Sequence, residues 1–174
     1  MSSIQVNFDE ILSILKSPSF QNKTEIEQQN EMHEKLDTCF DFKIISMLAL
    51  GRNWKRFSSP QKDEFSNYFS KLITNVYLSK IRGENLGGIK VDYQKVINLK
   101  TKSKRSDVYT LLHNNDIETP VVYRMIQKES KAWKAYDILV EGVSLIANYR
   151  DTYKQKHNVS PEIIINELKE KVGK

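Results

Sequence analysis

Cysteine is nearly absent from this chain of 174 residues, which has Cys39 alone. A single cysteine excludes an intramolecular disulfide and a zinc site built from cysteines. Long apolar runs are also missing, since stretches such as MLAL at 47–50 are only a few residues long. A helix needs about 20 apolar residues to cross a bilayer. The sequence therefore predicts no membrane-spanning helix.

The first residues, MSSIQVNFDE, lack the basic start and the apolar stretch of a signal peptide. We therefore expect either a cytoplasmic protein or a mature chain from which a leader has been removed. Composition does not choose between these two expectations.

Positive charge is unevenly distributed along the chain. The net charge is +5, yet residues 1–50 hold four basic and eight acidic side chains, so the excess lies in the later part. Between Lys80 and Arg105 there are eight basic residues against two acids. Such a concentration suits phosphates, nucleic acid or anionic headgroups, although lysines also keep an exposed hairpin soluble.

The first half of the chain has helical spacing and almost no glycine. We expect an amphipathic helix that ends before Pro18, a polar helix over about 23–39, and an apolar helix closed by Gly51. The strongest pattern predicts a helix from Pro60 to about Ile81, with Ser59 as its N-cap. Its apolar face is broad, so this helix must pack against something large.

The second half has the short period of β-strands. Strands are expected at about 90–101, 106–114, 119–128 and 131–141, joined by short links that favour an antiparallel meander. On the last strand Tyr136, Ile138 and Val140 should face one way, and Trp133, Ala135, Asp137 and Leu139 the other. After Gly142 we expect a helix over about 143–157, and then a final helix capped by Ser160.

The predicted fold class is α+β, with N- and C-terminal helices packed on a curved four-stranded antiparallel sheet of the NTF2-like kind that encloses an apolar pocket. We expect one domain over residues 1–174. It should be helical to about residue 81, form the sheet over about 89–141, and end in helices over about 143–172.

Several residues could be mistaken for catalytic or metal-binding groups. Ser144 lacks the glycine two positions later that a nucleophile elbow requires. His33, His113 and His157 are far apart and form no HExxH pattern, so we expect no metal site. GENLGG at 83–88 lacks the Lys-Ser/Thr of a phosphate loop and is better explained as a turn.

Two other hypotheses stay open at this stage. Asp137 lies beside aromatic residues on a strand, and burial could raise its pKa enough for it to act as a general base. Basic residues between Tyr93 and Tyr109 could bind single-stranded nucleic acid through phosphate contacts and base stacking. Neither pattern comes with the companion residues that would make it specific.

Five segments, in order, resemble the MlaC family, also called Ttg2-type or toluene-tolerance phospholipid-binding proteins. They are DF at 41–42, LALGRNW at 48–54, SPQKDEFSNYFSKLITNVY at 59–77, VDY at 91–93 and WKAYDILVEGVSLIANYRDTY at 133–153. The resemblance extends from about Phe40 to Lys171. The segment at about 20–38 and the basic turn KTKSKRSD carry no such likeness.

This resemblance implies a periplasmic carrier, not an enzyme, that holds a phospholipid as cargo and uses no cofactor. Its partners would be an inner-membrane Mla transporter complex and an outer-membrane Mla lipoprotein complex, with no nucleic acid and no stable membrane insertion. The role would be to maintain outer-membrane lipid asymmetry. The alternative is an NTF2-like small-molecule enzyme or binding domain that uses the same pocket.

The expected site follows from the helical and strand faces together with the resemblance. The wall of the lipid pocket is predicted to comprise Phe69, Leu72, Ile73, Val76, Tyr136, Ile138, Val140, Val143 and Ile146. Basic residues at the pocket mouth, facing the lipid phosphate or acidic partners, are predicted to be Lys80, Arg82, Lys90 and Arg150.

Overall fold

The computed structural model describes residues 2–82, 84, 86–101, 104–128 and 132–173, and of residues 2–7 the backbone alone. The helices are α1 (Ser2–Lys16), α2 (Pro18–Gln21), α3 (Glu25–Cys39), α4 (Phe42–Leu50), α5 (Ser59–Ile81), α6 (Leu145–Lys154) and α7 (Pro161–Val172), with 3₁₀ helices η1 (Gly51–Arg56) and η2 (Leu86–Gly88). The strands are β1 (Lys90–Leu99), β2 (Lys104–Asn114), β3 (Ile117–Gln127), β4 (Trp133–Val140) and β5 (Val143–Ser144). None of the helices in these residues is long and apolar enough to cross a membrane.

The helix boundaries follow from their capping residues. At α5 the N-cap is Ser58, not Ser59 as predicted, because Ser58 and Gln61 form a reciprocal capping box and the helix begins at Ser59. Pro60 then occupies the first turn, where a missing N–H costs nothing. Gly51 ends α4 with a φ of 55°, which confirms the expected positive-φ glycine cap.

The strands form one antiparallel sheet in the order β1-β2-β3-β4-β5. The sheet has five strands instead of the predicted four, because Val143 and Ser144 turn back and pair with Val140 and Leu139 before α6 begins. A helix had been expected from residue 143. Periodicity alone does not reveal a strand of two residues. The predicted start of the fourth strand at residue 131 lies outside the described residues.

The predicted facing of β4 is wrong in part. Arg124 pairs with Asp137 and Met125 with Ala135, so an extra residue, Tyr136, interrupts the alternation as a β-bulge does. Ala135 therefore joins the main core together with Ile138, while the ring of Tyr136 stacks under Arg105 at 5.2 Å. A bulge of this kind moves every residue before it to the other face of the strand.

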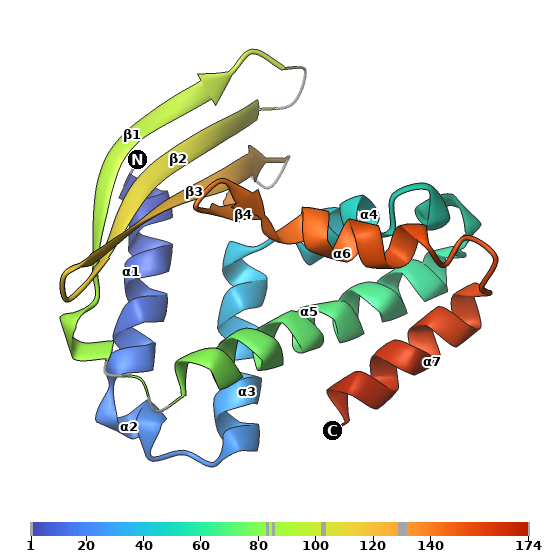
Figure 1. Ribbon diagram of the computed structural model, residues 1–174, viewed down its shortest axis with the longest axis horizontal. Helices are drawn as coiled ribbons and strands as arrows, with labels where there is room; N and C mark the ends of the chain where they lie inside the picture. The colour runs from blue at the N-terminus through green and yellow to red at the C-terminus, as the bar shows by residue number, and fades with distance from the viewer. Residues whose placement is uncertain (1, 83, 85, 102–103, 129–131, 174) are drawn as a thin grey trace.

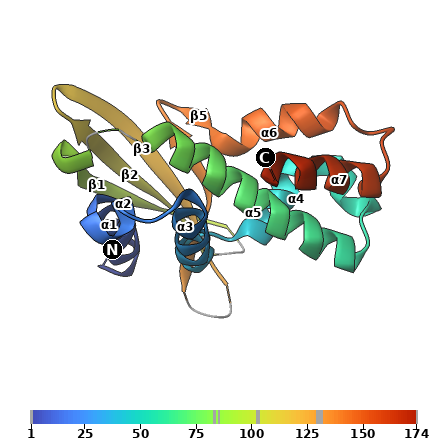
Figure 2. The same cartoon turned by 90° about the horizontal axis from the view of Figure 1, so that it is seen from below.

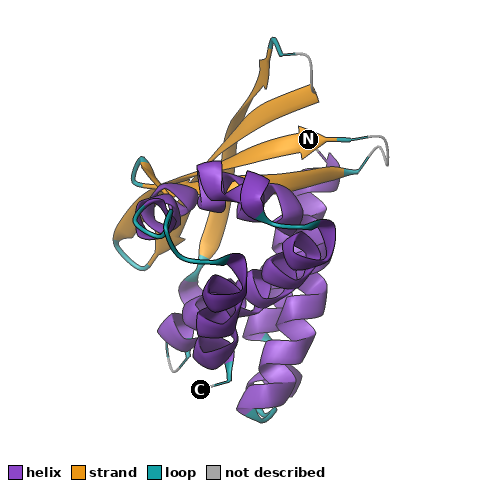
Figure 3. Cartoon of the chain, turned by 90° about the vertical axis from the view of Figure 1, so that its right-hand side faces the viewer, coloured by secondary structure: helices purple, strands orange, loops and turns teal. Residues whose placement is uncertain are grey.

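The helices gather on one side of the curved sheet (Figure 3). Helix α1 lies beside the sheet (Figure 1). Its Phe8 stacks on Tyr123 of β3 with ring centroids 4.1 Å apart. Helix α7 departs from the expected arrangement, because it packs mainly on α5 and does not cover the sheet. Helix α5 runs diagonally through the molecule and connects these two regions (Figure 2).

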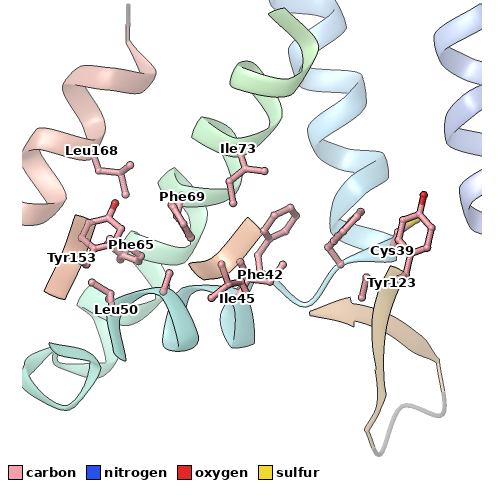
Figure 4. Packing of buried hydrophobic residues seen from close by; sticks show 14 of the residues in the cluster. Cys39, Phe42, Ile45, Leu50, Phe65, Phe69, Ile73, Tyr123, Tyr153 and Leu168 are labelled. Carbon is pink, nitrogen blue, oxygen red and sulfur yellow. The ribbon is translucent and has the colours of Figure 1, made fainter. Parts of the chain in front are cut away.

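One continuous core extends from the sheet to α7. Phe65 and Phe69 of α5 are fully buried, with ring centroids 5.3 Å apart, and Tyr153 of α6 contacts both edge-on. Figure 4 shows this row continuing through Ile73 toward Tyr123 at the sheet. The aromatic residues of α5 therefore form the centre of the helical part.

Candidate functional site

An apolar cavity of 400 Å³ lies where the helices meet the sheet. Ligand pockets in proteins typically have volumes of about 300–1,000 Å³. Residues from both compositional halves line the cavity: Leu36, Phe40, Phe42, Ile45, Ile73, Thr74, Tyr77, Val121, Tyr123, Ile138, Val140, Val143, Leu145 and Asn148. We call this space the apolar cavity.

The lining carries no charged side chain among the described residues. The hydroxyl of Thr74 donates to the carbonyl of Ser70 at 2.9 Å, so its polar group is already satisfied within α5. Burial raises the pKa of Tyr123 to about 12, which keeps its hydroxyl neutral over the ordinary pH range. The cavity is therefore suited to hold hydrocarbon and unsuited to stabilise a developing charge.

One side of the cavity has an exposed apolar rim. Tyr77 of α5 is 42% exposed, Val140 at the end of β4 is 45% exposed and Val143 of β5 is 59% exposed. The turn between the two valines contains Glu141 and Gly142, both with positive φ. The cavity thus opens between α5 and the β4–β5 turn.

The predicted wall residues fall into two groups. Ile73, Ile138, Val140 and Val143 line the apolar cavity. Phe69 and Ile146 are buried in the neighbouring core, Leu72 packs on that core, Val76 is half-buried, and Tyr136 contacts Arg105. The apolar face of α5 is wider than the cavity, so most of its apolar side chains pack in the core and do not line the cavity.

Sequence reasoning missed much of the lining from α3, α4 and β3. Phe40, Phe42 and Ile45 belong to the apolar segment FDFKII, which had been assigned to a packed helix without a link to the pocket. Val121 and Tyr123 alternate on β3, as residues that share one face of a strand do. The spacing of apolar residues in these segments indicates which positions are buried. It does not distinguish residues that line a cavity from residues packed in the core.

The four predicted mouth residues do not meet at one place. Lys80 lies over the ring of Tyr77 at 5.1 Å, which places it beside the rim. Arg82 forms an ion pair with Glu25 at 2.7 Å, and Lys90 is exposed at the start of β1. The Nε of Arg150 donates to the carbonyl of Leu48 at 3.0 Å in a separate cleft.

Asp137 is buried, but its partners give it a structural role. Its carboxylate accepts hydrogen bonds from the Ser144 hydroxyl at 2.7 Å and from the backbone N–H groups of Ile138 at 2.9 Å and Ile146 at 3.3 Å. Arg124 approaches it at 3.3 Å. These hydrogen bonds connect β4 to the beginning of α6. Asp137 does not line the apolar cavity, so it does not face a substrate there.

A second polar group has the order of a Ser-His-Asp triad. Nε2 of His33 lies 2.6 Å from Oγ of Ser70, and Nδ1 of His33 is 3.9 Å from Asp37. However, the Ser70 hydroxyl donates to the carbonyl of Asn67, is 2% exposed, and lines none of the described hollows. A nucleophile must reach a substrate space, and Ser70 does not. The contact between His33 and Ser70 therefore serves to join α3 to α5.

The tyrosines of the basic segment lie on opposite faces of the sheet. Tyr93 pairs with buried Thr110, and its hydroxyl donates to Asp9 of α1 at 3.1 Å. Tyr109 pairs with Lys95, whose ammonium lies 4.7 Å from the Tyr109 ring centroid. Bases stack on neighbouring rings of one surface, and these two rings do not form such a platform.

Comparison with known proteins agrees with this geometry. The phospholipid-binding protein from Ralstonia solanacearum, solved in complex with a phospholipid, has the same fold with a TM-score of 0.84 at 19% sequence identity, over 99% of this chain and 96% of that one. No curated protein sequence matches the chain. The family described as MlaC protein matches residues 5–170, which confirms the resemblance seen in the sequence. The chain belongs to the MlaC family.

Proposed function

We propose that this protein binds a phospholipid and that the apolar cavity holds hydrocarbon of its acyl chains. The observation that carries the proposal is the uncharged lining of the cavity, open to the surface through Tyr77, Val140 and Val143. The similar Ralstonia protein was solved with a phospholipid, which supports the same class of ligand here. Each CH₂ group moved out of water contributes about 0.8 kcal/mol, so even part of one chain supplies substantial affinity.

The lipid headgroup would lie outside the rim. Lys80 is the predicted mouth residue that the structure brings near the rim, through its contact with Tyr77. Its ammonium is on an exposed side chain and can follow a phosphate without being desolvated. We therefore keep Lys80 in the headgroup role and assign no such role to Arg82 or Lys90.

We further propose that the protein is a periplasmic shuttle between outer- and inner-membrane Mla complexes that maintains lipid asymmetry of the outer membrane. Membership of the MlaC family supports this role. A chain buried in the cavity leaves slowly on its own, so delivery needs a partner that opens the pocket or offers the lipid a better apolar environment. The rim is where such a partner would reach the lipid, since Val140 and Val143 on either side of the β4–β5 turn are exposed there.

Lipid analysis of the purified protein tests the binding proposal. Protein prepared without added ligand should release phospholipid on solvent extraction and show the corresponding added mass in native mass spectrometry. Delipidated protein should take up phospholipid from vesicles. Failure of both the extraction and the uptake would overturn the proposal.

A further inference from the structure

The end of α6 meets η1 in the helical part of the molecule, away from the sheet (Figure 1). A basic cleft lies there. It has a volume of 810 Å³ and is lined by Leu50, Gly51, Arg52, Asn53, Arg150, Asp151, Lys154 and His157. We call it the η1–α6 cleft. It shares no lining residue with the apolar cavity, to which α6 contributes Leu145 and Asn148.

The cationic side chains of this cleft lack acidic partners. Within the described part of the chain, Arg52, Arg150 and Lys154 form no ion pair, and Asp151 is the one acid in the lining. Arg150 is anchored through Nε on the carbonyl of Leu48, and no described bond uses its two terminal nitrogens. The cleft therefore combines positive charge with unused donors.

The basic residues beside the cleft are engaged in a different way. Arg56 donates to the carbonyls of His157 at 2.6 Å and Val159 at 2.9 Å, and Lys156 pairs with Glu167. These contacts fasten the loop after α6 to η1. Arg56 and Lys156 thus hold the walls together, whereas Arg52, Arg150 and Lys154 line the cleft.

A buried hydrogen bond joins the two walls of the cleft, and the space beside Gly51 is open. Asn53 is 4% exposed and its amide donates to the carbonyl of Tyr153 at 2.8 Å, which fixes η1 against α6. At Gly51 a Cβ would meet no atom within 4 Å, so a ligand has room beside the backbone there. The φ of 55° at Gly51 disfavours any side chain that would fill this space.

From these contacts we infer that the η1–α6 cleft is a second ligand site, which binds a phosphate group. Phosphate oxygens accept several charge-assisted hydrogen bonds, and guanidinium groups match them with two parallel donors. Arg52, Arg150 and Lys154 supply such donors around one open space. Inorganic phosphate and a phospholipid headgroup present the same recognised chemistry.

Titration calorimetry with inorganic phosphate at low ionic strength tests this site. The double variant R52Q/K154Q should weaken phosphate binding by roughly tenfold or more, since both lost contacts are charge-assisted. The matched control K104Q/K171Q removes the same charge at exposed positions on β2 and α7, outside the cleft. The control should bind phosphate as the unmodified protein does.

A second titration identifies the source of the phosphate. Glycerophosphoglycerol is a phospholipid headgroup without acyl chains. Binding of this compound that is lost in R52Q/K154Q assigns the site to headgroups, and binding of inorganic phosphate alone assigns it to the free ion. Both outcomes support a phosphate site.

Three results would overturn the inference: no phosphate binding by the unmodified protein, equal weakening in the control, or loss of stability in R52Q/K154Q with unchanged binding. The last result would mean that these cations only neutralise the negative C-terminal ends of α4 and α6. The test is independent of lipid binding, because phosphate should still bind to the cavity variant Ile138→Trp, which is described below.

Discussion

At the scale of single residues, Tyr123 joins the sheet, α1 and the apolar cavity. Its ring stacks on Phe8 and forms part of the cavity wall. Burial raises the pKa of its hydroxyl from 10.0 to about 12, and the negative charge of Asp9 contributes in the same direction. The folded protein therefore strongly prefers the neutral phenol, whereas the unfolded chain ionises at the ordinary pKa.

The variant Tyr123→Phe should reduce the loss of stability at alkaline pH. Because the pKa of Tyr123 is higher in the folded state, the neutral phenol contributes to the free energy of unfolding. This contribution is complete below pH 10 and is lost as the pH rises toward 12. For a shift from 10.0 to about 12, the loss is about 2–3 kcal/mol. Urea unfolding of both proteins between pH 7 and 12 measures it. If the free energies of unfolding of the two proteins changed equally with pH over this range, Tyr123 would not have the raised pKa.

Most of the correctly predicted cavity residues lie where the period of an element is regular; Val143 also lines the cavity, although its strand was predicted as the start of a helix. Ile73 on α5 and Ile138 and Val140 on β4 were found by spacing, and they line the cavity. Tyr136 was assigned to the same face, but the bulge between β3 and β4 removes it. Bulges depend on pairing with another strand, so the sequence of one strand does not contain them.

At the scale of elements, Asp137 holds three segments together. It accepts hydrogen bonds from its own strand through Ile138, from β5 through Ser144 and from the first turn of α6 through Ile146. Val143 and Leu145, which line the apolar cavity, lie within the segment that these bonds fix. The carboxylate therefore sets the position of one wall of the cavity.

Asp137→Ala should lower the free energy of unfolding by about 2–3 kcal/mol, because buried N–H and O–H donors lose a charged acceptor. Chemical denaturation monitored by circular dichroism measures this loss. Asp151→Ala is the matched control, since Asp151 is exposed on α6, and its effect should stay within about 0.5 kcal/mol. Equal stability of Asp137→Ala and the unmodified protein would remove Asp137 from this structural role.

The elements themselves were largely predictable, because caps and breaks are local. Pro18 ends α1 and Ser160 caps α7, both as predicted. Helix α3 was predicted over about 23–39, and its start is fixed by a local capping box of Thr24 and Glu27 that was not predicted. The strand β5 was missed because Val143 and Ser144 read equally well as the start of a helix. Their strand pairing depends on the positive φ values at Glu141 and Gly142, which turn the chain back onto β4.

At the scale of the whole molecule, the apolar cavity results from packing the helical half on the sheet half. Neither half encloses it alone, since its lining runs from Leu36 of α3 to Asn148 of α6. The scatter of the predicted mouth residues has the same origin. Lys80, Arg82 and Lys90 are close in sequence, but Lys80 lies on α5, Arg82 follows its end, and Lys90 begins β1. Arg150 lies on α6, a fourth place in the fold.

Filling the cavity should abolish lipid uptake without unfolding the protein. Ile138→Trp places a large ring in the apolar cavity from a half-buried position on β4, so the ring competes with acyl chains for 400 Å³. The matched control is Ile163→Trp, because Ile163 is 52% exposed on α7 and lies outside the cavity.

Uptake is measured with a fluorescent phospholipid transferred from vesicles, and folding is followed by circular dichroism. We expect Ile138→Trp to reduce bound lipid at least about tenfold, since excluding two or more CH₂ groups costs about 1.6 kcal/mol or more. Ile163→Trp should take up lipid as the unmodified protein does. Normal uptake by a folded Ile138→Trp protein would mean that the acyl chains lie elsewhere, and the space between α5 and β4 would then be a packing defect, not a binding site.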